Sequence, residues 1–231
     1  LDASIMEGKD LSAGAVAGLK HVKHPINAAY AVKTKSPHVM LSGAGAEEFA
    51  KEQGLEMVED NMYFATPKTM EWIEKLKQES KKNGTVGCVV LDKQGNLTAG
   101  TSTGGMFKKR WGRIGDSPVI GAGTYADNNS CAVSCTGHGE YFIRHAVAFD
   151  VCARYKYLKE SVEKAADYII HTELNTNAGN GGLIAVDKLG NIAMPYNSGG
   201  MFRGFLYKEK GSPEIKKGCG IGKKIVVVGE K

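Results

Sequence analysis

Apolar positions along this chain follow two periods, one of two residues and one close to the turn of an α-helix. Alternation over residues 3–6 and 13–22 predicts two extended segments, and short strands are predicted at 38–41 and, as a terminal edge strand, at 225–228. Apolar stripes, proline starts and glycine ends predict helices in several further segments. These helices cover residues 26–32, 46–53, a stretch that begins at 66–67, 139–160 and 161–173.

A strand–turn–strand pattern occurs twice. One copy spans residues 91–107 and the other spans 186–202. Both contain an Asp-Lys-x-Gly-Asn turn and both end in Gly-Gly-Met-Phe, so each predicts a β-hairpin with a glycine in its loop. The copies differ at their entry, where the first has Thr85 and the second has Asn180. Only the first hairpin therefore carries a hydroxyl at this point.

The order of these elements predicts a layered α/β protein. Strands are followed by a helical pair and then by strands again, which favours helices covering sheets. The glycine-rich hairpins favour antiparallel or mixed sheets. A length of 231 residues allows one large domain or two small ones.

Composition excludes several classes of protein. Hydrophobic content of 42% and charge of 24% are ordinary for a globular protein, and the 30 glycines have no fixed period that would indicate collagen or low complexity. No apolar run approaches the length of a membrane span. The net charge of +5 comes from basic stretches at 75–82, 108–113 and 216–224. These stretches lack interleaved aromatic residues and any nucleic-acid motif, so we expect no nucleic-acid partner.

The five cysteines predict no metal site and no disulfide framework. Cys131 and Cys135 are four positions apart, and no matching pair of histidines or cysteines accompanies them. Reduced, partly buried thiols fit best, which favours the cytoplasm, although the compartment stays open. We expect no metal and no cofactor.

A candidate nucleophile lies where a buried-looking strand follows a lysine-rich segment. The strand starts with Thr85, and Gly84 precedes it. A threonine acts as a nucleophile when its own α-amine takes the hydroxyl proton, which requires that the Gly84–Thr85 bond be cut. Glycine before the threonine suits such a cut because it tolerates strained backbone angles. An ordinary strand start remains the alternative.

Three polar clusters follow. A threonine of the segment 101–105 is suited either to contact a nucleophile or to satisfy a turn. Arg113 and Asp116 lie in a glycine-bracketed loop, where they form either a mutual ion pair or a site for the carboxylate and ammonium of a zwitterion. The segment 134–140 is suited to an oxyanion hole or to a helix N-cap. His138 lies there between two glycines, and we expect it to be exposed.

These motifs occur together in one known family. They are Leu1 to Gly8, Gly14 to Gly18, Gly84-Thr85-Val86-Gly87, Thr101 to Met106, Gly112 to Pro118 and Ala132 to Glu140. In this order they resemble the plant-type L-asparaginase/isoaspartyl peptidase family of N-terminal nucleophile hydrolases. The resemblance extends over nearly the whole chain, at least to Phe202.

The resemblance implies a four-layer αββα sandwich and an inactive precursor that cuts itself between Gly84 and Thr85. The chain 1–231 is then one hydrolase domain, in which 1–84 forms the end of an α subunit and 85–231 forms the β subunit. The implied substrates are L-asparagine and β-aspartyl (isoaspartyl) dipeptides, and the implied assembly is a homodimer of cleaved α/β pairs.

The resemblance also implies roles for individual residues. Thr85 is the nucleophile, and Thr103 and Thr136 supply the hydroxyls beside it. Thr136 and Gly137 serve the oxyanion. The substrate is bound by the remaining three residues: Arg113 for the α-carboxylate, and Asp116 with the carbonyl of Gly139 for the α-ammonium.

The chain departs from the family pattern in two places. The family has a further N-terminal stretch with a His-Gly-Gly strand and a loop that binds a structural sodium ion. We expect the chain to begin within the fold, without that stretch. The segment 197–201, Asn-Ser-Gly-Gly-Met, replaces an expected Thr-Glu-Gly-Met pattern and leaves the fit to the substrate open.

Three alternatives remain. Glycosylasparaginases start the nucleophile strand with Thr-Ile-Gly and carry disulfides, whereas this chain has Thr-Val-Gly and no evident cysteine pairing. An uncleaved, inactive member of the family would show no new terminus at Thr85. A phosphate-binding glycine loop would need a Gly-Lys-Ser/Thr or Gly-x-Gly-x-x-Gly motif, which the sequence lacks.

Overall fold

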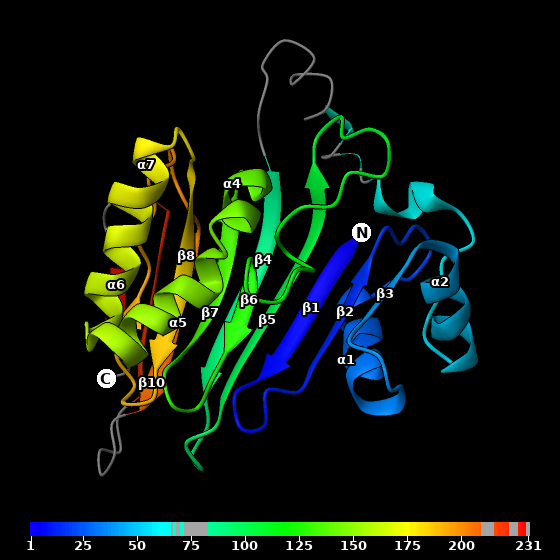
Figure 1. Cartoon of the computed structure of the whole chain (residues 1–231). Coiled ribbons are helices and arrows are strands. Elements are labelled where there is room, and N and C mark those ends of the chain that lie inside the picture. Colours follow the sequence, from blue (N-terminus) through cyan, green and yellow to red (C-terminus); the bar gives the residue numbers. More distant parts are fainter. Residues whose placement is uncertain (66, 68–69, 72–82, 209–214, 222–225, 230–231) are drawn as a thin grey trace.

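The computed structural model describes residues 1–65, 67, 70–71, 83–208, 215–221 and 226–229. Within these residues it is a mixed α/β protein whose strands form three sheets (Figure 1). Its five-stranded sheet contains, in spatial order, β3 (Met40–Ser42), β2 (Ala13–Ala17), β1 (Asp2–Glu7), β5 (Leu97–Met106) and β4 (Asn83–Leu91). Only β2 and β3 pair in parallel, so the sheet is mixed, as the sequence predicts.

The second sheet has four strands and is antiparallel. Its order is β6 (Thr124–Ala126), β7 (Cys131–Gly137), β8 (Gly181–Asp187) and β9 (Ile192–Ala193). Apolar side chains of the two sheets pack together, among them Met6 and Leu97 of the first sheet and Ala132 and Val186 of the second. β4 and β5 therefore lie over β7.

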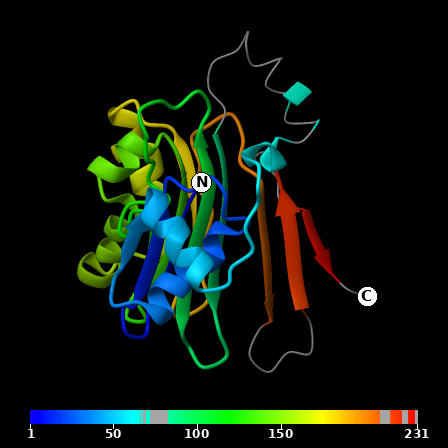
Figure 2. The same ribbon diagram turned by 90° about the vertical axis from the view of Figure 1, so that its right-hand side faces the viewer.

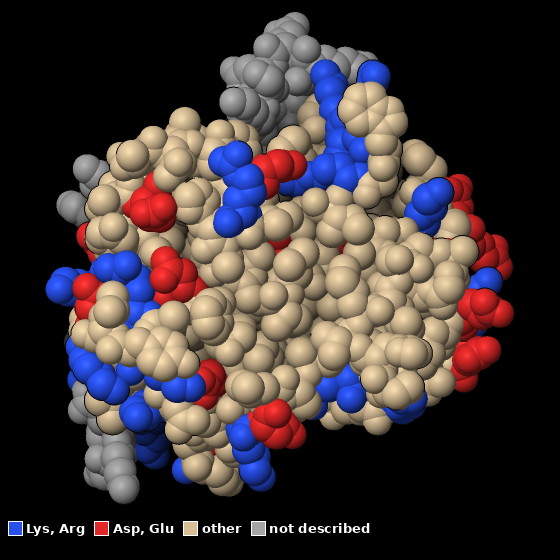
Figure 3. Space-filling model, viewed as in Figure 1, with Lys and Arg blue, Asp and Glu red and all other residues tan. Residues whose placement is uncertain are grey.

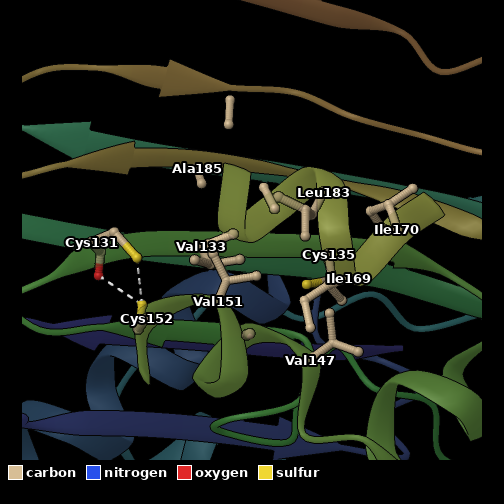
Figure 4. Packing of buried hydrophobic residues seen from close by; sticks show 14 of the residues in the cluster. Cys131, Val133, Cys135, Val147, Val151, Cys152, Ile169, Ile170, Leu183 and Ala185 are labelled. Atoms are coloured by element: carbon tan, nitrogen blue, oxygen red, sulfur yellow. Dashed lines mark hydrogen bonds between the residues drawn. The ribbon is translucent and has the colours of Figure 1, made fainter. Parts of the chain in front are cut away.

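Helices pack against the outer faces of both sheets. Next to β1 and β2 lie α1 (Pro25–Lys35) and α2 (Gly43–Glu52), which confirm the predicted helices at 26–32 and 46–53. Pro25 occupies the first turn of α1, where a missing N–H costs nothing. On the other sheet, Val147 and Val151 pack with Ile169 against Val133 (Figure 4).

The predicted helix 139–160 is wrong as a single element. It is divided into α4 (Gly139–Arg144) and α5 (Val147–Leu158) because Ala146 has a left-handed conformation with φ of 45°. The amides of Ala148 and Phe149 then donate to the carbonyls of Ala122 and Gly121, outside the helix. These hydrogen bonds connect the start of α5 to the segment that leads into β6.

The predicted helix 161–173 is confirmed in outline. Ser161 caps α6 (Val162–Tyr168) by accepting from the amide of Lys164. The chain then widens into a π-helical turn, Ile169–Glu173, and ends with α7 (Leu174–Thr176). A 3₁₀ turn covers Asn61–Phe64. The predicted helix from 66–67, with the lysine-rich segment 75–82 after it, lies outside the described residues apart from isolated positions.

A third sheet stands on the opposite side of the molecule from α5, α6 and α7 (Figure 2). It contains β10 (Arg203–Lys208), β11 (Ile215–Gly220) and β12 (Val226–Gly229) in that order. β12 confirms the predicted terminal edge strand. Phe202, just before β10, and Ile221, just after β11, line the same cavity as Gly84 and Thr85 of β4.

Candidate active site

The bond between Gly84 and Thr85 lies at an irregularity in the pairing of β4 with β5. Gly84 pairs with Gly105 and Thr85 pairs with Thr103, so Gly104 has no partner in the register. Such a bulge bends a strand and redirects its side chains. Gly105 adopts φ of +83°, a conformation that glycine tolerates at little cost. The bulge thus places the backbone carbonyl of Gly84 and the side chain of Thr85 close to Thr103.

Thr103 joins the two groups that a self-cleavage reaction would use. Its Oγ1 lies 2.8 Å from the carbonyl oxygen of Gly84, to which it donates, and 3.2 Å from Thr85 Oγ1. The amide of Gly105 donates to the same Oγ1 over 2.9 Å. A hydroxyl has one proton to donate and accepts twice, so all three contacts are compatible with one orientation. Thr103 is buried and held in this orientation.

A cavity of about 860 Å³ opens beside Thr85. Thr136 and Gly137, at the end of β7, line it together with Gly84 and Thr85. The lining also includes Phe202 and other residues near the third sheet. The structure therefore brings together four of the sequence-predicted residues at one cavity, with the hydroxyl of the fifth, Thr103, in contact with Thr85.

Two glycines allow the ends of β7 and β8 to meet at this cavity. Gly137 and Gly181 pair directly and have φ of +150° and +155°. A Cβ on Gly137 would lie 2.4 Å from the carbonyl oxygen of Asn180, and one on Gly181 would lie 2.2 Å from that of Thr136. The part of the cavity lined by Gly137 and Gly181 therefore consists of closely packed backbone.

The predicted substrate-binding residues form a second cluster beside the first. Arg113 makes two hydrogen bonds of 2.8 Å to the carboxylate of Glu140, through Nε and Nη2. This pair raises the pKa of Arg113 and lowers that of Glu140. Among the described residues Arg113 makes no ion pair with Asp116, so the mutual pair suggested by their spacing is not formed.

Asp116 differs from Arg113 and Glu140 in that its charged form is disfavoured by burial. Burial away from water raises its pKa from the ordinary 3.8 to about 7, and the charge of Arg113 opposes this only in part. Its Oδ2 has no hydrogen-bond partner within the described part of the chain. Gly139 lies against both side chains, since a Cβ there would be 2.8 Å from Arg113 Nη2 and 2.9 Å from Asp116 Oδ1. A buried carboxylate of this kind is suited to receive a cationic ligand group.

The loop that carries Arg113 is also tied to β1. Lys109 Nζ lies 3.2 Å from Oδ2 of Asp2, whose side chain is fully buried. Asp2 pairs in the sheet with Thr103. The loop and the Thr85–Thr103 contact thus share a neighbour, although Arg113, Asp116 and Gly139 do not line the cavity at Thr85.

The structure adds four residues that had no individual predicted role; two of them, Ser134 and Glu140, lie in the segment 134–140 that the sequence did indicate. Glu140 is the partner of Arg113, and Ser134, Asn180 and Phe202 line the cavity. The position of Asn180, equivalent to Thr85 in the repeated hairpin, was the available signal for one of them. His138 also lines the cavity, but the expectation that it is exposed is wrong: it is half-buried, and its Nδ1 is buried without a partner among the described residues.

The described residues contain no cluster of three or more histidine, cysteine or acidic side chains able to hold a metal ion. All five cysteines are free, and the sulfurs of Cys131 and Cys152 lie 2.7 Å apart in the core (Figure 4). None of the described helices has the length and apolar character that a membrane crossing requires. On the face shown in Figure 3, basic and acidic side chains are interspersed around the margin.

Comparisons with known proteins show the family of this chain. A sequence profile described as asparaginase matches residues 1–215. The isoaspartyl peptidase of Salmonella typhimurium is 48% identical over 221 residues, which cover 90% of this chain and 70% of the relative. The isoaspartyl peptidase of Escherichia coli is 44% identical over 91% of this chain and 73% of its own length. A probable isoaspartyl peptidase/L-asparaginase of Arabidopsis thaliana is 43% identical, with 88% and 71% covered.

Proposed function

Because this chain belongs to the asparaginase family, we propose that it is a self-cleaving amidohydrolase that uses Thr85 as its nucleophile. Its substrates are L-asparagine and β-aspartyl dipeptides. The names of the relatives from Salmonella typhimurium and Arabidopsis thaliana support this substrate class. The observation that carries the proposal is the position of Thr103 Oγ1, 2.8 Å from the Gly84 carbonyl oxygen and 3.2 Å from Thr85 Oγ1.

Self-cleavage is the first reaction. Thr85 Oγ1 attacks the carbonyl carbon of Gly84, and the hydrogen bond from Thr103 withdraws charge from the carbonyl oxygen as the tetrahedral intermediate forms. The C–N bond then breaks, the Thr85 nitrogen takes a proton, and Gly84 is left as an ester on Oγ1. Water hydrolyses this ester, which leaves a carboxylate on Gly84 and a free α-amine on Thr85.

Turnover of substrate repeats the same chemistry with a different carbonyl. The freed amine of Thr85 has a reference pKa of about 7.7–8.0 and accepts the hydroxyl proton near neutral pH. Oγ1 attacks the substrate's side-chain amide carbon, while Thr136 and Gly137 stabilise the oxyanion. Ammonia, or the amine of the second residue of a dipeptide, leaves with that proton. Water then releases aspartate from Thr85.

The cluster around Arg113 orients the substrate. Arg113 donates to the α-carboxylate, and Asp116 with the carbonyl of Gly139 receives the α-ammonium. The buried and unpartnered Oδ2 of Asp116 supports this role, since a cation beside it would lower its pKa and stabilise its charge. Glu140 already occupies the guanidinium fork of Arg113, so a bound carboxylate shares Arg113 with it or displaces it.

The architecture we propose is the αββα sandwich of four layers. α1 and α2, the two facing sheets, and the helices α5 and α6 supply these layers. In this scheme 1–231 is one domain, self-cleavage divides it into 1–84 and 85–231, and two cleaved pairs form a homodimer. The packing of helices on both sheets supports the scheme.

Turnover assays test the function. Purified protein is incubated at neutral pH with L-asparagine or with a β-aspartyl dipeptide, and the release of aspartate is measured. We expect both substrates to be hydrolysed, and we expect Thr85→Ala to show no activity above background. Thr98→Ala, on the same strand as Thr103 but remote from the cavity, is the matched control and should be as active as the natural sequence. Normal turnover by Thr85→Ala would refute the mechanism.

A further inference from the structure

A second row of hydroxyl groups lies one step below the Thr85–Thr103 contact. Side chains on a strand alternate between its faces, so Thr101 points to the same side of β5 as Thr103, and Ser134 to the same side of β7 as Thr136. Thr101 Oγ1 and Ser134 Oγ lie 2.7 Å apart across the two sheets. This contact lies next to the cavity, because Ser134 is part of its lining.

From there the hydroxyl contacts continue away from the cavity. Thr101 Oγ1 lies 2.6 Å from Thr124 Oγ1, and Thr124 Oγ1 lies 2.7 Å from Ser4 Oγ. Ser4 Oγ ends the series 2.6 Å from the carbonyl oxygen of Ser117. All four hydroxyl-bearing residues are at most 3% exposed. They come from β7, β5, β6 and β1, so the contacts connect four strands of both sheets.

The strand register places these residues in two facing pairs. Ser4 pairs with Thr101 in one sheet, and Thr124 pairs with Ser134 in the other. Gly87 continues the first row on β4, next to Thr101. A Cβ on Gly87 would lie 2.2 Å from Ser134 Oγ, so only glycine leaves room for this hydroxyl. The contact with Ser134 therefore explains why the Thr-Val-Gly motif has a glycine two residues after Thr85.

The far end of the series reaches the loop that carries Asp116. Ser117, whose carbonyl oxygen contacts Ser4 and Thr124, is the next residue along the chain. Gly123 packs against the same backbone, since a Cβ on it would lie 2.4 Å from the Asp116 carbonyl oxygen. Thr101 Oγ1 also lies 3.1 Å from the carbonyl oxygen of Gly123. The hydroxyl series thus links β5, which pairs with the strand of Thr85, to the loop of the substrate-binding residues.

Apolar side chains of similar size could occupy the positions of these four hydroxyl residues without the free-energy cost of burying polar atoms. Buried hydroxyls require partners, and loss of one partner leaves its neighbours unsatisfied. In exchange, hydrogen bonds of 2.6–2.7 Å fix distances and directions that methyl contacts do not. Such a connected series is suited to hold two parts of a site in a defined relative position.

We infer that Ser4, Thr101, Thr124 and Ser134 are positioning residues that hold the loop of Arg113 and Asp116 at a fixed place relative to Thr85. This inference rests on the proposed function, in which the loop binds the substrate and Thr85 attacks it. Self-cleavage needs Thr85 and Thr103 but not the loop. Loss of the series at its loop end should therefore weaken substrate capture and leave self-cleavage intact.

Thr124→Val tests this directly because it replaces the hydroxyl by a methyl group of nearly the same size. Self-cleavage is followed by intact mass spectrometry, and kcat and KM are measured with L-asparagine. We expect cleavage at the natural extent and an increase in KM of about tenfold, since small displacements of positioning groups cost large factors in rate or capture. Thr124→Ser should restore KM. Thr98→Val, the same chemical change outside the series, should leave KM unchanged.

Hydrogen exchange supplies a second readout that does not depend on turnover. Amides of the segment 113–117 should exchange about tenfold faster in Thr124→Val than in the natural protein or in Thr98→Val. Ser4→Ala, at the loop end, should give the same pattern and replaces Thr124→Val if that variant does not fold. An unchanged KM together with unchanged exchange would overturn the positioning role. If the natural protein does not hydrolyse asparagine, the proposed function fails, and exchange alone decides whether the series holds the loop.

Discussion

The hairpins β4–β5 and β8–β9 have the same turn and different outer ends. In each turn an aspartate Oδ1 accepts from the amide of the asparagine four residues later, over 2.7 Å for Asp92 and 2.9 Å for Asp187. The glycines of the two turns have φ of 84° and 90°. The second strands then differ, because β5 has ten residues whereas β9 has two.

A proline explains where the second hairpin departs from the first. Pro195 occupies the place equivalent to Gly100 and cannot donate to β8, so β9 ends at Ala193. Pairing resumes only at an isolated bridge between Gly182 and Tyr196. The first hairpin continues to the bulge at Thr85, and the second reaches the cavity with Asn180. The two hairpins thus share their turns and differ at the ends that reach the cavity.

The largest effect is expected when the first hairpin is given the entry residue of the second. Thr85→Asn should abolish self-cleavage and turnover, because the amide side chain is no substitute for the hydroxyl nucleophile.

The reciprocal change, Asn180→Thr, should create no second cut. The Gly179 carbonyl accepts from Asn197 Nδ2 over 3.1 Å, and Ser198, the counterpart of Thr103, donates to the Gly200 carbonyl. Denaturing electrophoresis checks both, and a cut before position 180 would refute the comparison.

Thr103→Val should have the next largest effect. It keeps the shape of the side chain and removes the hydrogen bond to the Gly84 carbonyl, so self-cleavage should slow by about 10²–10³-fold. The time course of cleavage after purification measures this rate. Ser198→Ala is the matched change in the second hairpin and should leave the rate unaltered. Cleavage of Thr103→Val at the natural rate would show that this hydroxyl does not assist the reaction.

Two buried aspartates sharpen the contrast between folding and chemistry. Asp187 is hydrogen-bonded within its turn, whereas Asp116 has an unpartnered Oδ2 and a pKa raised by burial to about 7. Between about pH 4 and 7 the folded protein keeps a proton on Asp116 that the unfolded chain releases. The Asp116 contribution to stability is therefore present below pH 4 and is lost as pH rises to 7.

Asp116→Asn should remove this pH dependence. We expect its free energy of unfolding at pH 8 to rise by on the order of 2 kcal/mol relative to the natural protein, because the uncompensated buried charge is gone. Turnover should be lost in the same variant. Urea titrations at pH 5 and pH 8 measure the difference. An equal effect of the substitution at both pH values would contradict the raised pKa.

The smallest effects are expected at the turns themselves. Asp187→Ala removes a buried carboxylate together with its hydrogen bonds to the turn and should cost about 2 kcal/mol of unfolding free energy. Asp92→Ala removes the same hydrogen bonds from an exposed turn, where water replaces them, and should cost less. Urea unfolding compares the two variants. A larger loss in Asp92→Ala would mean that burial does not govern the difference between the turns.

The sequence predicted local features well. The alternation at 3–6, the proline at the start of α1 and the two Asp-Lys-x-Gly-Asn turns all depend on neighbours along the chain, and the structure has each of them. The break at Ala146 was not predicted because alanine in a left-handed conformation leaves no local signal. Tertiary hydrogen bonds to Gly121 and Ala122 determine it.

Candidate site residues divide in the same way. Gly84 and Thr85 were recognisable as neighbours in a motif, whereas the partner of Arg113 is Glu140, from a different segment. The contact of Thr101 with Ser134 likewise joins two sheets whose facing cannot be read from either strand alone. Site residues that are neighbours in one motif can be predicted from the sequence, whereas contacts that form only when the two sheets pack together cannot.

Intact mass spectrometry of the purified protein, after incubation at neutral pH, shows whether the chain is cut before Thr85. We expect the 24.7 kDa chain to be replaced by two fragments that divide between Gly84 and Thr85, with an unblocked threonine at the start of the second. A single uncut species that persists through the incubation would contradict the assignment of Thr85 as a competent nucleophile.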